Sequence, residues 1–168
     1  MVSKKKKKVV VAVSGGFDPV HIGHIRHFNH AKKLGDELVV ILNNDNWLKQ
    51  KKGYVFMPEQ ERRALIAALG AVDRVVLTRH RPGTKDTTVC AELRRLRPDI
   101  YANGGDRTFR KGELSPEGKV CLEIGCRRAY NVGYGGKVQS SSWLIENLIK
   151  RGICYCGSGE KYKKCHGR

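Results

Sequence analysis

Long apolar runs are absent: no stretch of this 168-residue chain approaches the ~20 apolar residues that a membrane-spanning helix needs. The N-terminus also lacks the apolar core of a signal peptide. We find no internal repeat, and the length fits one domain of ordinary size with a small appendage. We therefore expect a soluble, cytoplasmic protein with one main core.

Acidic residues are scarce. Asp and Glu number 16 against 33 Lys and Arg, which gives a formal net charge of +17, and much of it lies in Lys4–Lys8 and from Lys150 onward. The remainder suits an enzyme of triphosphates and phosphate esters. Basic ends attract nucleic acid without reading its sequence, but a solvated tail explains Lys4–Lys8 equally well. No aromatic residue lies among these lysines, so stacking on bases finds no support there.

The six cysteines are not spread as a disulfide framework would require. Cys90, Cys121 and Cys126 are scattered through the main domain and are interpreted as small core residues. The other three lie close together at the C-terminal end, beside a histidine. This distribution favours a metal site in a reducing compartment over disulfides.

Strand-like and helix-like segments alternate along the chain. Such alternation predicts an α/β fold, a Rossmann-like parallel sheet with helices on both faces and ligands bound at the carboxyl ends of its strands. We expect a basic leader at 1–8, the main domain at 9–151 and a zinc-bound tail at 152–168. The predicted strands are Val9–Val13, Glu37–Leu42, Val72–Thr78, Pro98–Ala102 and Arg127–Val132. The predicted helices are Ile22–Leu34, one that Pro58 opens, Thr87–Leu96, Pro116–Gly125 and one that the run Ser140–Ser142 opens and that extends through Lys150. Polar loops are predicted at Asn43–Met57 and Asn103–Ser115.

The most informative segment lies between the first predicted strand and helix, and reads Ser14-Gly15-Gly16-Phe17-Asp18-Pro19-Val20-His21-Ile22-Gly23-His24. A strand, a glycine turn and a helix N-terminus together form a phosphate site. His21 and His24 would lie at the first helical turn, where they can donate to phosphate oxygens that gain charge during nucleotidyl transfer. Asp18 would position Mg²⁺ or, as we favour, hold the turn by accepting backbone N–H groups.

This run resembles the Gly-x-Phe-Asp-x-x-His-x-Gly-His signature of the cytidylyltransferase-like nucleotidyltransferases, and the resemblance covers about residues 8–150. It implies an enzyme that joins a nucleoside triphosphate to a phosphorylated acceptor and releases pyrophosphate with Mg²⁺. It also implies nucleotide contacts from Gly15, Gly16, Phe17 and Asp18, and a homodimer. Class I aminoacyl-tRNA synthetases carry a similar element, but this chain is too short for their other domains.

The resemblance assigns roles to three further segments. In Lys49, Lys51 and Lys52 it implies a phosphate-binding lysine, for which we choose Lys49, although a solvated charge run is the alternative. Arg62 resembles an arginine that reaches the acceptor phosphate or triphosphate; a surface salt bridge would explain it equally well. Asn103–Arg107 looks like the Gly-Gly-Asp segment of heptose-phosphate adenylyltransferases, which implies nucleotide contacts from Gly105 and Asp106 and an acceptor contact from Arg107.

A serine run opens the last helix. Ser140, Ser141 and Ser142 resemble the Ser-Thr-Thr segment of these families, which implies contacts to the β- and γ-phosphates, with Lys137 adding charge ahead of them. An upstream arginine typical of glycerol-phosphate cytidylyltransferases is missing, which tilts the prediction towards ATP and a sugar-phosphate-like acceptor, with CTP and a polyol phosphate still open.

Three other side chains of this region are predicted to lie outside the chemistry. His27 and His30 are interpreted as residues of the helix surface. Trp47, in the lysine-rich loop, is expected to pack that loop, with stacking on a base as the alternative.

The tail places Cys154, Cys156, Cys165 and His166 in the pattern Cys-x-Cys, eight residues, Cys-His. Three thiolates and an imidazole suit tetrahedral Zn²⁺ and leave no open position for catalysis. Metal binding would supply the folding energy of so short a segment. The tail resembles the SEC-C motif of the bacterial preprotein-translocase motor ATPase, which implies docking to a protein or ribosome partner.

Three hypotheses follow from the sequence. The chain is an active nucleotidyltransferase with a zinc docking tail, a catalytically idle nucleotide-binding module that recruits partners through the tail and basic ends, or a protein that binds RNA or the ribosome through its charge. The intact histidines and serines favour the first.

Overall fold

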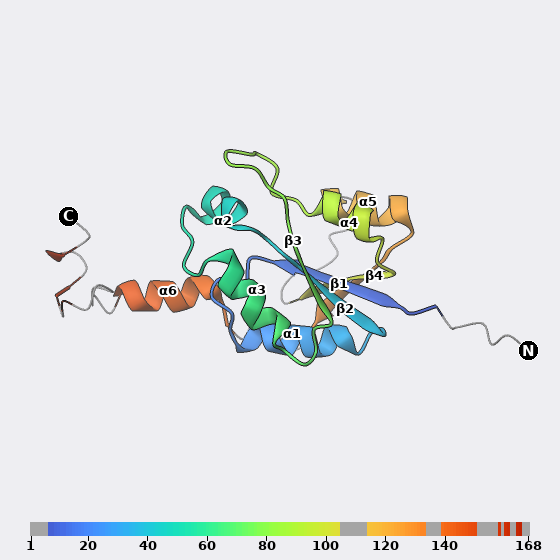
Figure 1. Cartoon of the computed structure of the whole chain (residues 1–168), viewed down its shortest axis with the longest axis horizontal. Coiled ribbons are helices and arrows are strands. Elements are labelled where there is room, and N and C mark those ends of the chain that lie inside the picture. Colours follow the sequence, from blue (N-terminus) through green and yellow to red (C-terminus); the bar gives the residue numbers. More distant parts are fainter. Residues whose placement is uncertain are drawn as a thin grey trace, which may run out of the picture.

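Five parallel strands form one sheet in the order β3-β2-β1-β4-β5, as the computed structural model shows (Figure 1). The structure describes residues 7–104, 114–133 and 139–150, together with 158, 160, 161, 164 and 165. The predicted Rossmann-like parallel sheet is confirmed. The strands are β1 Val10–Gly15, β2 Glu37–Leu42, β3 Arg74–Leu77, β4 Ile100–Gly104 and β5 Arg127–Val132.

Helices cover both faces of the sheet. Two of them, α1 and α3, lie on one face, and α4 and α5 lie together on the other (Figure 1). The last helix, α6, points away from the sheet (Figure 1). No helix within the described part of the chain is long and apolar enough to cross a membrane. The helices are α1 Ile22–Lys32, α2 Asp45–Lys52, α3 Glu59–Ala67, α4 Cys90–Leu96, α5 Pro116–Ile124 and α6 Ser141–Lys150.

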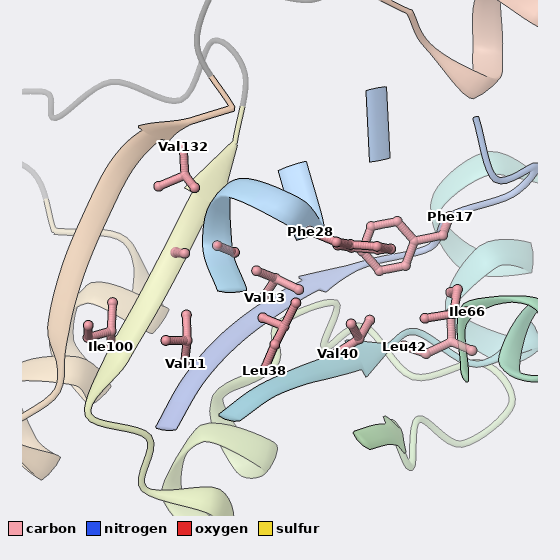
Figure 2. Packing of buried hydrophobic residues seen from close by; sticks show 12 residues of the cluster. Val11, Val13, Phe17, Phe28, Leu38, Val40, Leu42, Ile66, Ile100 and Val132 are labelled. Carbon is pink, nitrogen blue, oxygen red and sulfur yellow. The ribbon is translucent and has the colours of Figure 1, made fainter. Parts of the chain in front are cut away.

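The core has two layers because successive side chains of a strand point to opposite faces. In β1, Val11 and Val13 pack under α1 against Phe28, whereas Ala12 packs with Leu93 under α4 and α5. Figure 2 shows the larger cluster, on the α1 face. Burial of both faces explains why the central strands are almost continuously apolar.

The strand order determines where a ligand can bind. From β1 the chain moves outward to β2 and β3, then returns to place β4 on the other side of β1. Crossovers on the two sides of this point leave a crevice beyond the carboxyl ends of β1 and β4. The glycine turn after β1 therefore lies at the switch point of the sheet.

One predicted loop contains a helix. We expected Asn43–Met57 to be irregular, but Asp45–Lys52 forms α2. The Asn44 side chain accepts the Trp47 N–H at the N-cap, and Gly53 ends the helix in the left-handed conformation (φ 81°). Leu48 is its one fully buried side chain, so the sequence carries little apolar periodicity to reveal it.

The other predicted elements are found with small shifts at their ends. Glu37–Leu42 and Arg127–Val132 match their strands, whereas the fourth helix begins at Cys90, later than the predicted Thr87. The three-part division of the chain at 8 and 151 stays a prediction, because most of the leader and of the tail lies outside the described residues.

Candidate functional site

A cavity of ≈ 360 Å³ opens at the carboxyl ends of β1 and β4, where the strand order predicts a ligand. Its wall comes from the glycine turn, the first two turns of α1, the ends of β4 and β5, Lys52 of α2 and the segment that opens α6. Of the predicted catalytic and nucleotide-binding residues, the following line it: Gly15, Gly16, Phe17, His21, His24, Ser140, Ser141 and Ser142.

His21 and His24 form a capping box at the N-terminus of α1. The Nδ1 atom of His21 accepts the Gly23 N–H (3.1 Å), and the Nδ1 atom of His24 accepts the backbone N–H of His21 (3.3 Å). A capping box joins the N-cap residue to the third helical residue. The spacing of the two histidines is therefore the spacing that a capping box at this helix end needs.

The same bonds fix the tautomers of the two rings. Because each Nδ1 accepts a backbone N–H, the ring hydrogen of each neutral imidazole lies on Nε2. Burial, with smaller contributions from the neighbouring His21, His27 and Lys52, lowers the pKa of His24 to about 3. The rings stack at 3.6 Å between centroids, which suits neutral groups. At neutral pH His24 is therefore a neutral ring that can donate a hydrogen bond through Nε2, and not a cation.

Close packing leaves little room for a side chain at the glycines of the motif. A Cβ on Gly23 would lie 3.0 Å from the His21 ring, and one on Gly16 would lie 2.9 Å from Leu48 Cδ2. Trp47 packs on the same glycine and donates its Nε1–H to the Thr87 carbonyl (2.8 Å). For Trp47 the structure therefore shows the expected packing role.

Phe17 packs against the ring of His24. It is 6% exposed and meets the rings of His24 and Phe28 edge-on, at 4.8 and 5.0 Å between centroids. Its positive φ of 48° is uncommon for a residue with a side chain and turns the ring into the core. Figure 2 shows Phe17 beside Phe28 in the cluster.

Asp18 holds a loop and does not line the cavity. Its carboxylate is fully buried and accepts the backbone N–H groups of Phe56 (2.8 Å) and Met57 (2.7 Å). Of the two roles weighed from the sequence, the structure shows the one that holds the chain. The resemblance implied a nucleotide contact from Asp18, but this carboxylate does not line the cavity.

Lys52 occupies the position that we expected for Lys49. Lys49 is exposed and outside the cavity, whereas Lys52 lines it with Nζ 3.3 Å from the Asp18 carbonyl. Burial lowers the pKa of Lys52, and Asp18 opposes this effect. In an irregular loop the three lysines looked equivalent, but as part of α2 they point in different directions.

Arg62 is fully buried, which does not fit the expected contact with a phosphate. Its guanidinium donates to the carbonyls of Gly16 (2.6 Å), Asn43 (2.7 Å) and Met57 (2.8 Å) and pairs with Asp45 (2.6 Å). It therefore ties the glycine turn to the end of β2, to α2 and to the start of α3.

The serine run meets the glycine turn. Ser141 donates its hydroxyl to the Pro19 carbonyl (2.9 Å), and the Ser140 carbonyl accepts the Leu144 N–H. These bonds place the start of α6 against the start of α1. The remaining predicted site residues lie outside the described part of the chain: Gly105, Asp106, Arg107, Lys137, Cys154, Cys156 and His166.

Two residues of α1 that line the cavity were not predicted from the sequence. Arg26 and His27 both line the cavity, and His27 was expected on the helix surface. The spacing of His21, His24 and His27, three residues apart, was the signal, because residues three apart share a helix face.

Comparison with known proteins agrees with this geometry. Residues 12–119 match the family model described as cytidylyltransferase-like, and residues 153–168 match the SEC-C motif. Over 150 residues the chain is 39% identical to the FAD synthase of Thermococcus sibiricus, covering 87% of this chain and 96% of that protein. It is 33% identical to the bifunctional protein HldE of Syntrophotalea carbinolica, of which it spans 29%.

A solved structure is similar as well. The lipopolysaccharide core biosynthesis protein of Thermoplasma volcanium superposes with a TM-score of 0.61 at 32% sequence identity. The similarity covers 77% of this chain and all of that one.

Proposed function

Because this chain belongs to the cytidylyltransferase-like family of nucleotidyltransferases, we propose that it transfers the adenylyl group of ATP to a phosphorylated acceptor and releases pyrophosphate. The observation that carries the proposal is the pair of imidazoles, His21 and His24, that cap α1 at the cavity. Their fixed tautomers present donors where a triphosphate would accept them.

In this reaction an acceptor phosphate oxygen attacks the α-phosphorus and pyrophosphate leaves in line. Charge builds up on the phosphate oxygens, so donors and cations held in place lower the barrier. His21 and His24 supply the N–H donors, Lys52 supplies a cation, and the serines at the start of α6 supply hydroxyls. No acid–base residue is needed, because a phosphate acceptor is already ionised.

Mg²⁺ fits this site through the nucleotide more than through the protein. Among the described residues that line the cavity there is no Asp or Glu. A magnesium ion would therefore be held mainly by the phosphates of ATP, as is common for this cation. It would neutralise charge on the leaving pyrophosphate.

The acceptor we propose is FMN. FAD consists of FMN joined to AMP, so a relative named FAD synthase performs this class of transfer, and the chain matches one over nearly the whole of both proteins. A sugar phosphate is the second candidate, because the chain also resembles part of bifunctional protein HldE.

A panel of substrates tests the proposal. Pyrophosphate release is measured with ATP, CTP, GTP and UTP, each crossed with FMN, a heptose phosphate and glycerol phosphate. We expect turnover with ATP and FMN, accompanied by FAD formation. Silence of every pair, with a triphosphate still bound, would instead favour the recruitment module that the sequence left as an alternative.

The tail is proposed to hold structural zinc. Three cysteines and one histidine form a donor set that suits Zn²⁺, and the segment matches the SEC-C motif. We expect native mass spectrometry to find one zinc ion per chain, and a chelator to remove hydrogen-exchange protection from residues 153–168 but not from the main domain.

Cysteine variants provide the matched control for zinc. Cys154→Ser is expected to lose the metal, whereas Cys90→Ser, in α4, is expected to keep it. A chain that carries no zinc, or a Cys154→Ser variant that retains it, would contradict this proposal. Docking of a protein or ribosome by the tail, contact of the basic ends with nucleic acid, and a homodimer stay predictions.

A further inference from the structure

The cavity has two chemically different ends. At one end His21, His24 and Lys52 face the start of α6 and form the phosphate site described above. At the other end, His27 of the second turn of α1 meets the ends of β4 and β5. The first end is built from donors and a cation. Among the described residues that line the cavity, those from β4 and β5 include no lysine or arginine, and the cation nearest in sequence to His27 is Arg26 of α1.

His27 is held in place at this second end. Its Nδ1 lies 2.9 Å from the carbonyl oxygen of Val132, the last residue of β5. A carbonyl only accepts, so Nδ1 carries the hydrogen and donates it. In the neutral ring Nε2 is therefore an acceptor, which is the opposite of the tautomer fixed for His21 and His24.

Glycine ends β4 beside this ring, and a second glycine follows the last residue of β5. A Cβ on Gly104 of β4 would lie 2.8 Å from Nδ1 of His27, and one on Gly133 would lie 3.5 Å from the His27 Cα. A side chain at Gly104 would thus displace the imidazole. The ring is part of the cavity wall and not a surface group of α1.

The opposite tautomer selects a different part of the ligand. Phosphate oxygens only accept, so a neutral His27 with its Nε2 lone pair is a poor phosphate ligand. Ribose hydroxyls and the exocyclic amine of adenine donate. The rise of an α-helix puts His27 about 4.5 Å beyond His24, one ribose away from a phosphate bound at the first turn.

We propose that His27 recognises the nucleoside of the triphosphate, with Nδ1–H anchored on the Val132 carbonyl and Nε2 accepting a hydrogen bond from the nucleoside. This inference rests on the proposed function, since it needs a nucleotide in the cavity. It orients the ligand with its phosphates at the first turn of α1 and its nucleoside over the ends of β4 and β5.

Two probes separate this role from its alternatives: ATP, and inorganic tripolyphosphate, which has no nucleoside. Binding of each is measured by titration calorimetry with Mg²⁺, for the full chain and for His27→Asn. An asparagine amide can still donate to the Val132 carbonyl but has no acceptor at the position of Nε2. We expect ATP affinity to fall about tenfold and tripolyphosphate affinity to change less than about twofold.

Three comparisons complete the design. His30→Gln, one turn further along α1 and outside the cavity lining, is expected to leave both affinities unchanged. His24→Asn is expected to weaken both ligands. His27→Gln, which keeps an acceptor near the position of Nε2, is expected to lose less ATP affinity than His27→Asn, and it serves if the asparagine variant does not fold.

The outcomes are distinguishable. Equal loss of both ligands in His27→Asn, or no loss of ATP affinity, would overturn the inference and leave the proposed function intact. Failure of the native chain to bind ATP would overturn both. In turnover assays the Michaelis constant for ATP should rise in His27→Asn, while the constant for the acceptor stays within about twofold, a split that a merely structural role would not produce.

Discussion

We expect replacement of His24 by asparagine to lower the turnover number about 100- to 1000-fold at saturating ATP while the protein keeps its fold. The asparagine oxygen can accept the backbone N–H of His21, as Nδ1 does in the native chain, so the cap of α1 survives. The Nε2–H donor is lost, and removal of one fixed donor to a developing oxyanion has an effect of this size. Steady-state pyrophosphate release measures the turnover number, and circular dichroism tests whether the fold is kept.

The glutamine variant is the matched control. His24→Gln places its amide near the position of Nε2, so it retains a donor to phosphate but cannot cap the helix in the same way. We expect it to be less stable than His24→Asn but more active. Near-normal turnover of His24→Asn would remove this imidazole from the mechanism.

We expect replacement of Arg62 by methionine to lower the free energy of unfolding by about 3–5 kcal/mol, the range for removing one partner of a buried ion pair. Arg62 is fully buried, and without it the carbonyls of Gly16 and Asn43 lose a donor while Asp45 loses its counter-charge. Urea unfolding of the full chain measures this change.

Two neighbouring substitutions identify the cause. Arg63→Met removes an exposed guanidinium one residue further along α3, and we expect a change within about 0.5 kcal/mol. Arg62→Lys keeps the charge but not the planar set of donors, so most of the loss should remain. Native stability of Arg62→Met together with weak binding of the acceptor would instead restore the phosphate contact expected from the sequence.

The sheet could be predicted because its signals are local. Apolar segments such as Glu37–Leu42 alternate along the chain with segments whose apolar residues have the periodicity of a helix. A parallel sheet that is buried on both faces needs such apolar segments. Helix α2 could not be predicted in this way, because its stability comes from end caps at Asn44 and Gly53 and from the single buried Leu48. The spacing of apolar residues in a sequence does not show where helix caps form.

The position of the two motif histidines at the cavity was predictable for a similar reason. His21 and His24 lie within a continuous motif, and both line the cavity. The sequence could not distinguish Lys49 from Lys52, because the direction of each side chain depends on helix α2, which the sequence did not reveal. Arg62 has the chemistry of a phosphate ligand, and only the packing of α3 against the glycine turn shows that its donors are used inside the protein.

His27 shows the limit of reasoning from one element. Its spacing from His24 was visible in the sequence, but its role depends on Gly104 and Val132, which approach α1 from two other strands. Contacts between segments far apart along the chain, such as this one, follow from topology and not from local pattern.

Transfer of label from ATP tests the central claim most directly. ATP labelled at the α-phosphorus is incubated with the native chain, Mg²⁺ and FMN, and the products are separated. The account predicts that the label appears in FAD, with one pyrophosphate released for each FAD formed, and that His24→Asn slows both together. Label recovered only as ATP, AMP or ADP in the presence of FMN and of the other phosphorylated acceptors would contradict it.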